Sequence, residues 1–255
     1  MSNPFDLSGK VAIVTGANTG IGQGIAVALA QAGADIVAVS RSDTAETQKA
    51  VEAAGPAFLH IAADLGTTAP IAGIVAQTVK RFGKIDILVN NAGIIRRADA
   101  LDFTEEDWDA VMDVNLKSAF FLAQACAKQM TGPDAKSGGG KIINIASMLS
   151  FQGGIRVASY AASKSGLAGI TRLLANEWAG KGINVNAIAP GYFETNNTEA
   201  LRADQTRARD ILARIPAGRW GRPSDLGGAA VFLASAASDY VHGTILPVDG
   251  GWLAR

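Results

Sequence analysis

The chain has 255 residues, of which 48% are hydrophobic, and its 23 basic and 23 acidic residues balance. This is enough apolar material for one large domain, and the charge balance argues against a nucleic-acid or membrane partner. The single cysteine, Cys126, cannot form an internal disulfide, and the opening MSNPFDLSGK has no apolar signal core. His60 and His242 lack the spacing of metal ligands. We therefore expect a cytoplasmic protein with no metal site.

Short β-branched runs alternate with segments of helical spacing along the whole chain. The runs are almost continuously apolar, which indicates strands buried on both faces of a parallel sheet. Alternation of strand and helix at this spacing predicts right-handed βαβ units. We expect one α/β domain over residues 1–255, a doubly wound parallel sheet of the Rossmann type in three layers. The predicted strands span residues 11–15, 35–40, 58–64, 86–92, 141–147, 183–190 and 243–249.

Residues 192–222 interrupt this alternation. The segment is polar, has some helical spacing and follows the end of a predicted strand. Insertions at such a position often cover a cleft, so we interpret it as a substrate lid. The alternative is an ordinary surface excursion.

The sequence TGANTGIG at residues 15–22 joins the first predicted strand to the first predicted helix. Such a turn directs backbone N–H groups and the positive helix end toward the crevice at the carboxyl ends of the strands. Gly16 suits the tight turn, Gly20 lets a pyrophosphate approach the backbone, and Gly22 allows close packing of helix and strand. The turn therefore predicts a dinucleotide site, although its glycine spacing differs from that of most dinucleotide folds.

The second predicted strand ends in VSRSD. An acidic residue at this point would bind the adenosine ribose of NAD, but Ser40 occupies the position. Arg41 follows and can pair with the 2′-phosphate of NADP, whereas Asp43 would have to fold back to replace the missing acid. The residues alone leave the choice between NAD and NADP open.

Ser147 ends a predicted strand, and Tyr160 and Lys164 follow in YAASK. If residues from about Ala158 are helical, Tyr160 and Lys164 share one face. An ammonium near a phenol favours the phenolate, so Lys164 would lower the pKa of Tyr160 and prepare it for general acid/base work. Ser147 would orient the substrate oxygen.

These motifs, together with NNAG at 90–93 and PG at 190–191, resemble the short-chain dehydrogenase/reductase family over essentially the whole chain. The resemblance implies that Tyr160 is the catalytic acid/base, that Lys164 also binds the nicotinamide ribose, and that Asn115 anchors a water in a proton relay. It also implies a homotetramer. The cofactor-binding set predicted from the turn and the resemblance comprises Gly16, Asn18, Gly20, Ile21, Gly22, Ser40, Arg41, Asp64, Leu65, Asn91, Ala92, Gly93, Tyr160, Lys164, Pro190, Gly191 and Thr195.

A closer resemblance, carried by NNAGIIRR, NIASMLSFQGGIRV and VDGGWLAR, is to the subgroup that acts on 2-deoxy-D-gluconate or 2-dehydro-3-deoxy-D-gluconate. It implies hydride transfer between a nicotinamide cofactor, NAD ahead of NADP, and a secondary alcohol of a sugar acid. The acid group would need an arginine, for which we name Arg156 and Arg97, and Gln152 is a candidate for sugar hydroxyls.

Three alternatives remain at this point. Two are enzymes on the same scaffold, a gluconate 5-dehydrogenase and a 3-ketoacyl carrier reductase. The third is a nucleotide-sensing binding protein without catalysis, against which the complete set of Ser147, Tyr160 and Lys164 argues. Trp252 can lie on its own subunit or reach a neighbouring one.

Overall fold

A computed structural model describes residues 3–133, 135–136 and 138–255. Its centre is one sheet of seven parallel strands in the order β3-β2-β1-β4-β5-β6-β7. The predicted doubly wound parallel sheet is therefore confirmed. The strands are β1 (Val11–Thr15), β2 (Asp35–Ser40), β3 (Phe58–Ala62), β4 (Ile87–Asn90), β5 (Gly140–Ile145), β6 (Ile183–Pro190) and β7 (Ile245–Val248).

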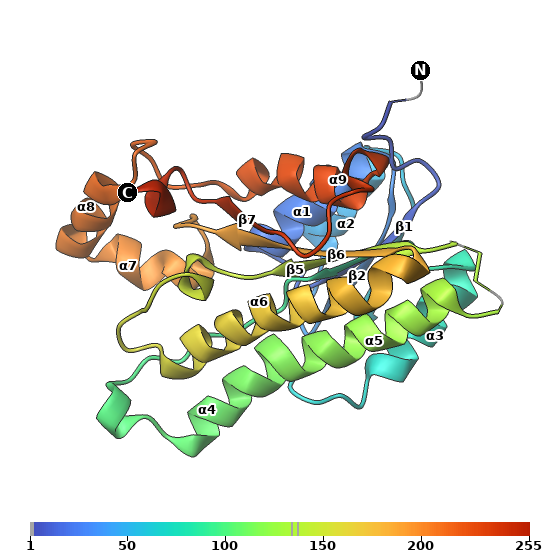
Figure 1. Ribbon diagram of the computed structural model, residues 1–255. Helices are drawn as coiled ribbons and strands as arrows, with labels where there is room; N and C mark the ends of the chain where they lie inside the picture. The colour runs from blue at the N-terminus through green and yellow to red at the C-terminus, as the bar shows by residue number, and fades with distance from the viewer. Residues whose placement is uncertain (1–2, 134, 137) are drawn as a thin grey trace.

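Helices cover both faces of the sheet, which gives the three predicted layers. Figure 1 shows α1, α2 and α9 on one face and α3, α5 and α6 on the other, with α7 and α8 projecting at one end of the sheet. The helices are α1 (Gly20–Gln31), α2 (Ala45–Ala53), α3 (Ile71–Phe82), α4 (Glu105–Met112), α5 (Ser118–Thr131), α6 (Ala158–Trp178), α7 (Glu199–Ala203), α8 (Gln205–Arg214) and α9 (Gly227–Ala234).

The continuous apolar pattern of the strands reflects two cores, one on each face. In β1, Ala12 and Val14 pack into a cluster with residues of α1 and α9. Val11 and Ile13 belong to a second cluster with residues of α3 and α5. Because successive strand side chains point to opposite faces and both faces are covered, most positions of a central strand are apolar.

Four strands are shorter than the sequence pattern predicts. β3, β4, β5 and β7 end one to two residues before the predicted boundaries, whereas β1, β2 and β6 match them. The residues that leave the ladder at the carboxyl ends include Asn91 and Ser147, which turn toward the cleft described below. Strand pairing therefore stops where the site begins.

Strand order reverses between β1 and β4, the two neighbours at the middle of the sheet. After β1 the chain continues to β2 on one side of β1, whereas after β4 it continues to β5 on the other side. The two connections therefore diverge and leave a crevice at the carboxyl ends of β1 and β4. Ligands of open parallel sheets bind at such a switch point.

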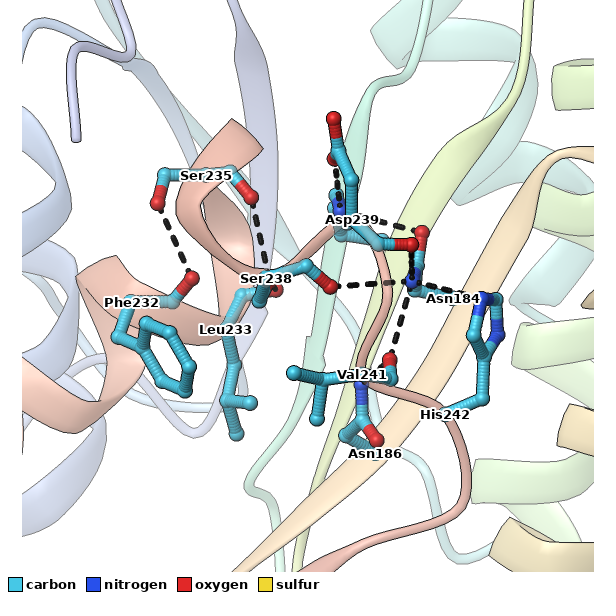
Figure 2. Close-up of polar contacts among 10 residues, drawn as sticks. Asn184, Asn186, Phe232, Leu233, Ser235, Ser238, Asp239, Val241 and His242 are labelled. Carbon is cyan, nitrogen blue, oxygen red and sulfur yellow. Dashed lines mark hydrogen bonds and ion pairs between the residues drawn. The ribbon is translucent and has the colours of Figure 1, made fainter. Parts of the chain in front are cut away.

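The amino end of β6 is fixed by two buried asparagines, Asn184 and Asn186 (Figure 2). Asn184 Nδ2 lies 3.0 Å from the carbonyl oxygens of both Asp239 and Val241. Asn186 Nδ2 donates to Val241 O at 2.8 Å. These bonds pin the connection between α9 and β7 at the end of the sheet opposite to the crevice.

Cys126 lies on α5 and is fully buried. Burial raises the pKa of its thiol to about 12. The described residues include no cluster of three or more potential metal-binding side chains, and none of the described helices is long and apolar enough to cross a bilayer.

Candidate active site

The glycine turn between β1 and α1 is clamped from the neighbouring strand. Gly16 and Gly20 have φ values of +65° and +58°, a region that favours glycine. Asn91, just after β4, donates from Nδ2 to Thr15 O at 2.9 Å and to Gly16 O at 3.2 Å. A Cβ on Gly22 would collide with Gly16 O and with Asn91 Nδ2. The close approach expected at Gly22 is therefore present, and Asn91 makes it rigid.

Two adjoining cavities form a groove along this turn. One of about 150 Å³ lies at the end of β2 and β3. The other, of about 380 Å³, runs from the turn to Tyr160 and Lys164. All the predicted cofactor residues line one or both: Gly16, Asn18, Gly20, Ile21, Gly22, Ser40, Arg41, Asp64, Leu65, Asn91, Ala92, Gly93, Tyr160, Lys164, Pro190, Gly191 and Thr195.

The groove fits an extended dinucleotide. The Thr19 side chain, which precedes α1, does not cap the helix. The first backbone N–H groups of α1 therefore have no hydrogen bond from this side chain. A Cβ on Gly20 would meet only the Thr195 side chain, at 3.4 Å or more. Helix N–H groups beside an open backbone form a site for a pyrophosphate.

At the far end of the groove, the end of β2 carries a cation, Arg41, rather than an acid; the acid there, Asp64, follows β3. Arg41 lines both cavities. Asp43 does not fold back, because its Oδ2 accepts from Ala45 N at 3.2 Å at the start of α2. Ser40 Oγ donates to Ser42 O at 2.6 Å, which fixes the turn that carries Arg41. The acid that would bind an unphosphorylated ribose is missing from the end of β2.

Ser147, Tyr160 and Lys164 meet at the other end of the groove. Ser147 follows β5, and Tyr160 and Lys164 lie one turn apart on α6; all three line the same cavity. Lys164 Nζ lies 5.7 Å from the centre of the Tyr160 ring. It donates to Ile145 O at 2.6 Å, which holds the buried ammonium beside β5. The predicted sharing of a helix face is therefore confirmed.

Burial dominates the electrostatics of this cluster. Burial raises the pKa of Tyr160, and smaller opposing effects come from contact with the Ser147 hydroxyl and from the charge of Arg97. Burial also lowers the pKa of Lys164 to about 8. In the protein without cofactor, desolvation of the phenolate therefore outweighs the opposing effects. The predicted lowering of the Tyr160 pKa by Lys164 concerns the cofactor-bound site and stays a prediction.

Asn115 lies in a π-helical turn, Asp113–Lys117, between α4 and α5. Its Oδ1 accepts from Ile94 N at 2.8 Å, and its Nδ2 donates to Ile94 O at 3.0 Å and to Ser163 Oγ at 3.2 Å. The side chain thus braces the loop after β4 against α6. Because both ends of the amide are used in this way, its role in a proton relay stays a prediction.

A third cavity, of about 370 Å³, opens from Ser147 and Tyr160 toward α8. Arg97 and Gln152 line it, as expected of substrate residues. Arg156 does not: it adopts a φ of +63° and its Nε lies 3.2 Å from Asp99 Oδ1. Arg156 is thus paired with a carboxylate outside the cavity lining, and contact with the substrate stays a prediction for it.

The same cavity contains side chains that we did not predict, among them Arg207 and Arg214 of α8 and the rings of Tyr192 and Trp252. Trp252 packs on its own chain, 4.8 Å from the Tyr192 ring. The spacing of residues 207, 211 and 214 was a usable signal, because such residues share one helix face.

The interrupting segment 192–222 begins and ends at one place. Phe193 pairs with Gly221 in a short bridge, and Glu194 N donates to Gly221 O at 2.8 Å. Between these points α7 and α8 extend over the third cavity, which Leu201, Ile211 and other residues of the segment line. The two ends of the segment are therefore joined, and whether it acts as a lid stays a prediction.

A groove that fits a dinucleotide, meets a Ser-Tyr-Lys cluster and continues into a further cavity is typical of a nicotinamide-dependent oxidoreductase. The chain belongs to the short-chain dehydrogenase/reductase family. A family model described as enoyl-(acyl carrier protein) reductase matches residues 16–253. The predicted family and enzyme class are confirmed.

Individual relatives narrow this class. The chain is 63% identical to a 2-dehydro-3-deoxy-D-gluconate 5-dehydrogenase of Dickeya dadantii (strain 3937) over 254 residues, 99% of each chain. It is 60% identical to a candidate 2-deoxy-D-gluconate 3-dehydrogenase of Agrobacterium tumefaciens solved with bound NADP, with a TM-score of 0.92 and full coverage of both chains. A gluconate 5-dehydrogenase of Burkholderia cenocepacia, in complex with NADP and tartrate, is 43% identical with a TM-score of 0.93, covering 99% of this chain and 98% of that one.

Proposed function

We propose that this protein transfers a hydride between NADP(H) and C5 of 2-dehydro-3-deoxy-D-gluconate, a six-carbon sugar acid. The observation that carries the proposal is the position of Ser147 and Tyr160, where the cofactor groove meets the arginine-lined third cavity. The 63% identity with a 5-dehydrogenase of this substrate supports the choice of compound.

NADP replaces NAD as the first choice of cofactor in this proposal. Arg41 lines the groove at the end of β2, where a 2′-phosphate would lie, and Asp43 is turned away toward α2. An arginine can bind a phosphate with two parallel hydrogen bonds. The NADP bound by the Agrobacterium and Burkholderia proteins supports the same choice.

When bound, the nicotinamide ring supplies or accepts the hydride. In the direction of reduction, Tyr160 donates the proton to the keto oxygen, and its raised pKa keeps the hydroxyl protonated at neutral pH. Ser147 donates a hydrogen bond to the same oxygen and orients it toward Tyr160. Lys164 holds the ribose, and Asn115 belongs to the relay that returns a proton to Tyr160.

The segment 192–222 acts as a lid in this proposal. Its ends are joined by the Phe193–Gly221 bridge, so α7 and α8 can move as one flap while the sheet stays fixed. The bidentate pair of Arg219 with Asp225, at 2.6 and 3.0 Å, fixes the chain next to this base. A lid of this kind would exclude water from the hydride-transfer site.

We also propose a homotetramer in the cytoplasm. Trp108, Phe121 and Leu173 are 40%, 40% and 48% exposed on α4, α5 and α6, and large exposed apolar side chains are typical of subunit interfaces. The unpaired thiol of Cys126 is typical of a reducing compartment. Light scattering on the purified protein would test the assembly, and a monomer would contradict it.

Initial rates test the function directly. The substrates are 2-dehydro-3-deoxy-D-gluconate, 2-deoxy-D-gluconate, D-gluconate and an acetoacetyl thioester, each with NADP(H) and NAD(H). We expect the highest kcat/KM with the first compound and NADP(H). Preference for the thioester would favour a ketoacyl carrier reductase, preference for D-gluconate a gluconate 5-dehydrogenase, and absence of any change in nicotinamide absorbance a non-catalytic binding protein.

A further inference from the structure

One face of α8 forms a charged wall of the third cavity. Helical residues three, four and seven positions apart lie on the same face. The residues of α8 that line the cavity follow this spacing. They are two cations, one acid and one apolar residue: Arg207, Arg214, Asp210 and Ile211. Ile211 is buried and attaches the helix to the molecule, so the charged residues on either side of it are directed along the cavity.

Arg214 is the best fixed of these cations. Its guanidinium carbon lies 4.1 Å from the centre of the Trp252 ring. Trp252 is only 4% exposed, and its Nε1 donates to Gln152 Oε1 at 3.3 Å. A guanidinium stacked on an aromatic ring keeps its N–H edge free, in one orientation, for a planar anion. Arg214 is therefore prepared for a carboxylate.

The cavity also concentrates arginines that the protein has not neutralised. Neither Arg97 nor Arg214 forms an ion pair with any residue that the structure describes, and Asp210 pairs with Arg209 at 3.7 Å. Three arginines that do not line the cavity are paired with carboxylates: Arg96 with Asp107, Arg156 with Asp99, and Arg219 with Asp225. The cavity itself therefore holds arginines whose charge no carboxylate of the described residues neutralises.

Arg97 and Arg214 serve different ends of this cavity. Arg97 lines the cavity together with Tyr160, and its Nη2 donates to Asn197 O at 3.1 Å, in the chain between β6 and α7. Arg214 lies against Trp252 on the α8 side. Four carbon–carbon bonds of about 1.5 Å each separate C1 from C5 of a sugar acid, but only two separate C1 from C3. A substrate that reacts at C5 therefore needs its carboxylate partner away from Tyr160, where Arg214 lies.

We propose that Arg214, held over the Trp252 ring, binds the carboxylate of the substrate and so determines the preference of this site for sugar acids over neutral sugars. The inference rests on the proposed function for the identity of the substrate. It concerns a step, recognition of the acid group, that can be measured without turnover.

The test measures the dissociation constants of D-gluconate and of its neutral counterpart D-glucitol with the NADP⁺-loaded protein. Variants are Arg214→Gln, Arg214→Lys and Arg97→Gln. The matched control is Arg172→Gln, on α6, outside the cavity lining and without an ion-pair partner among the described residues. Loss of a charge-assisted bidentate bond should weaken D-gluconate by about 10- to 100-fold in Arg214→Gln. D-Glucitol and NADP⁺ should bind as before, and Arg214→Lys should fall in between.

The inference is overturned if Arg214→Gln keeps the ratio of the gluconate and glucitol constants, or if Arg97→Gln alone abolishes it. A fall in affinity for both ligands would also overturn it, because that pattern marks damage to the cavity rather than loss of the acid contact. If the unaltered protein oxidises no sugar acid yet binds D-gluconate through Arg214, the proposed function fails and the carboxylate site stands.

Discussion

Lys164 Nζ lies 5.7 Å from the centre of the Tyr160 ring and donates to the backbone carbonyl of Ile145 at 2.6 Å. The ammonium is thus placed by β5 as well as by its own helix, and it faces the cofactor groove beside the phenol. In the protein alone burial dominates both groups, since the pKa of Tyr160 is raised and that of Lys164 is lowered.

Replacement of Tyr160 by Phe should abolish proton transfer and leave the groove intact. General acid/base groups typically contribute a factor of about 10² to 10⁴, so we expect kcat to fall at least about 100-fold. The dissociation constant of NADPH, measured by fluorescence, should change little. Tyr240→Phe is the matched control, because Tyr240 is fully exposed. Turnover near that of the unaltered enzyme would remove Tyr160 from the mechanism.

Lys164→Met should show that the buried ammonium costs stability. The folded-state pKa of about 8 lies below the ordinary value of 10.5, so charging Lys164 at pH 7 costs on the order of 3 kcal/mol. Loss of the bond to Ile145 O offsets part of this. Between about pH 8 and 10.5 the folded enzyme has released the proton that the unfolded chain keeps, so its stability rises with pH relative to the variant.

Thermal melts of both proteins from pH 7 to pH 10 measure this difference. The Tm of Lys164→Met should exceed that of the unaltered protein most at pH 7, and the gap should shrink as pH rises. A gap that is constant over the whole range would mean that Lys164 does not change its charge there.

Arg41→Leu should change cofactor preference. If Arg41 binds the 2′-phosphate, its loss removes a charge-assisted bond and should lower kcat/KM for NADP about 10- to 100-fold, while kcat/KM for NAD stays within a few-fold. Arg81→Leu is the control, because Arg81 packs over Phe82 on α3, outside the groove. Equal losses with both cofactors would contradict a role for Arg41 in selecting between them.

Gly22→Ala should destabilise the protein and weaken cofactor binding together. The added Cβ would collide with Gly16 O and Asn91 Nδ2, so α1 would have to move away from β4. Gly73→Ala on α3 is the control: its Cβ would meet only Gln77 Nε2, at 3.9 Å, and alanine favours the helix by about 1 kcal/mol. We expect a lower Tm for the first variant and an equal or higher Tm for the second. Equal Tm values for the two variants would mean that the glycine turn tolerates a displacement of α1.

The sheet and the groove could be predicted because their signals are local. Continuous apolar runs marked β1 and β2 within their true bounds, and the turn at Gly16 and Gly22 has the packing that its glycines imply. Tyr160 and Lys164 share a face because α6 begins at Ala158, as the pattern indicated. These features need only the spacing of residues along one element.

The substrate cavity was harder to predict, because its residues come together from distant loops. Arg156 has the right chemistry, but its loop places it beside Asp99. Arg214 contacts Trp252 because the chain after β7 returns to α8. Neither segment has a sequence pattern that predicts this contact. The direction of the shift in the Tyr160 pKa likewise depends on how deeply the ring is buried. A sequence motif does not predict that burial.

The lone cysteine offers a practical route to the motion of α7 and α8. Cys126 is enclosed within α5, and a thiol whose pKa is near 12 scarcely forms thiolate at neutral pH. A maleimide dye or nitroxide would therefore react with a cysteine introduced at the exposed Leu212 and leave the native sulfur untouched. Attachment of a single probe to α8 would test by spectroscopy whether the proposed lid opens and closes, without prior removal of the native thiol.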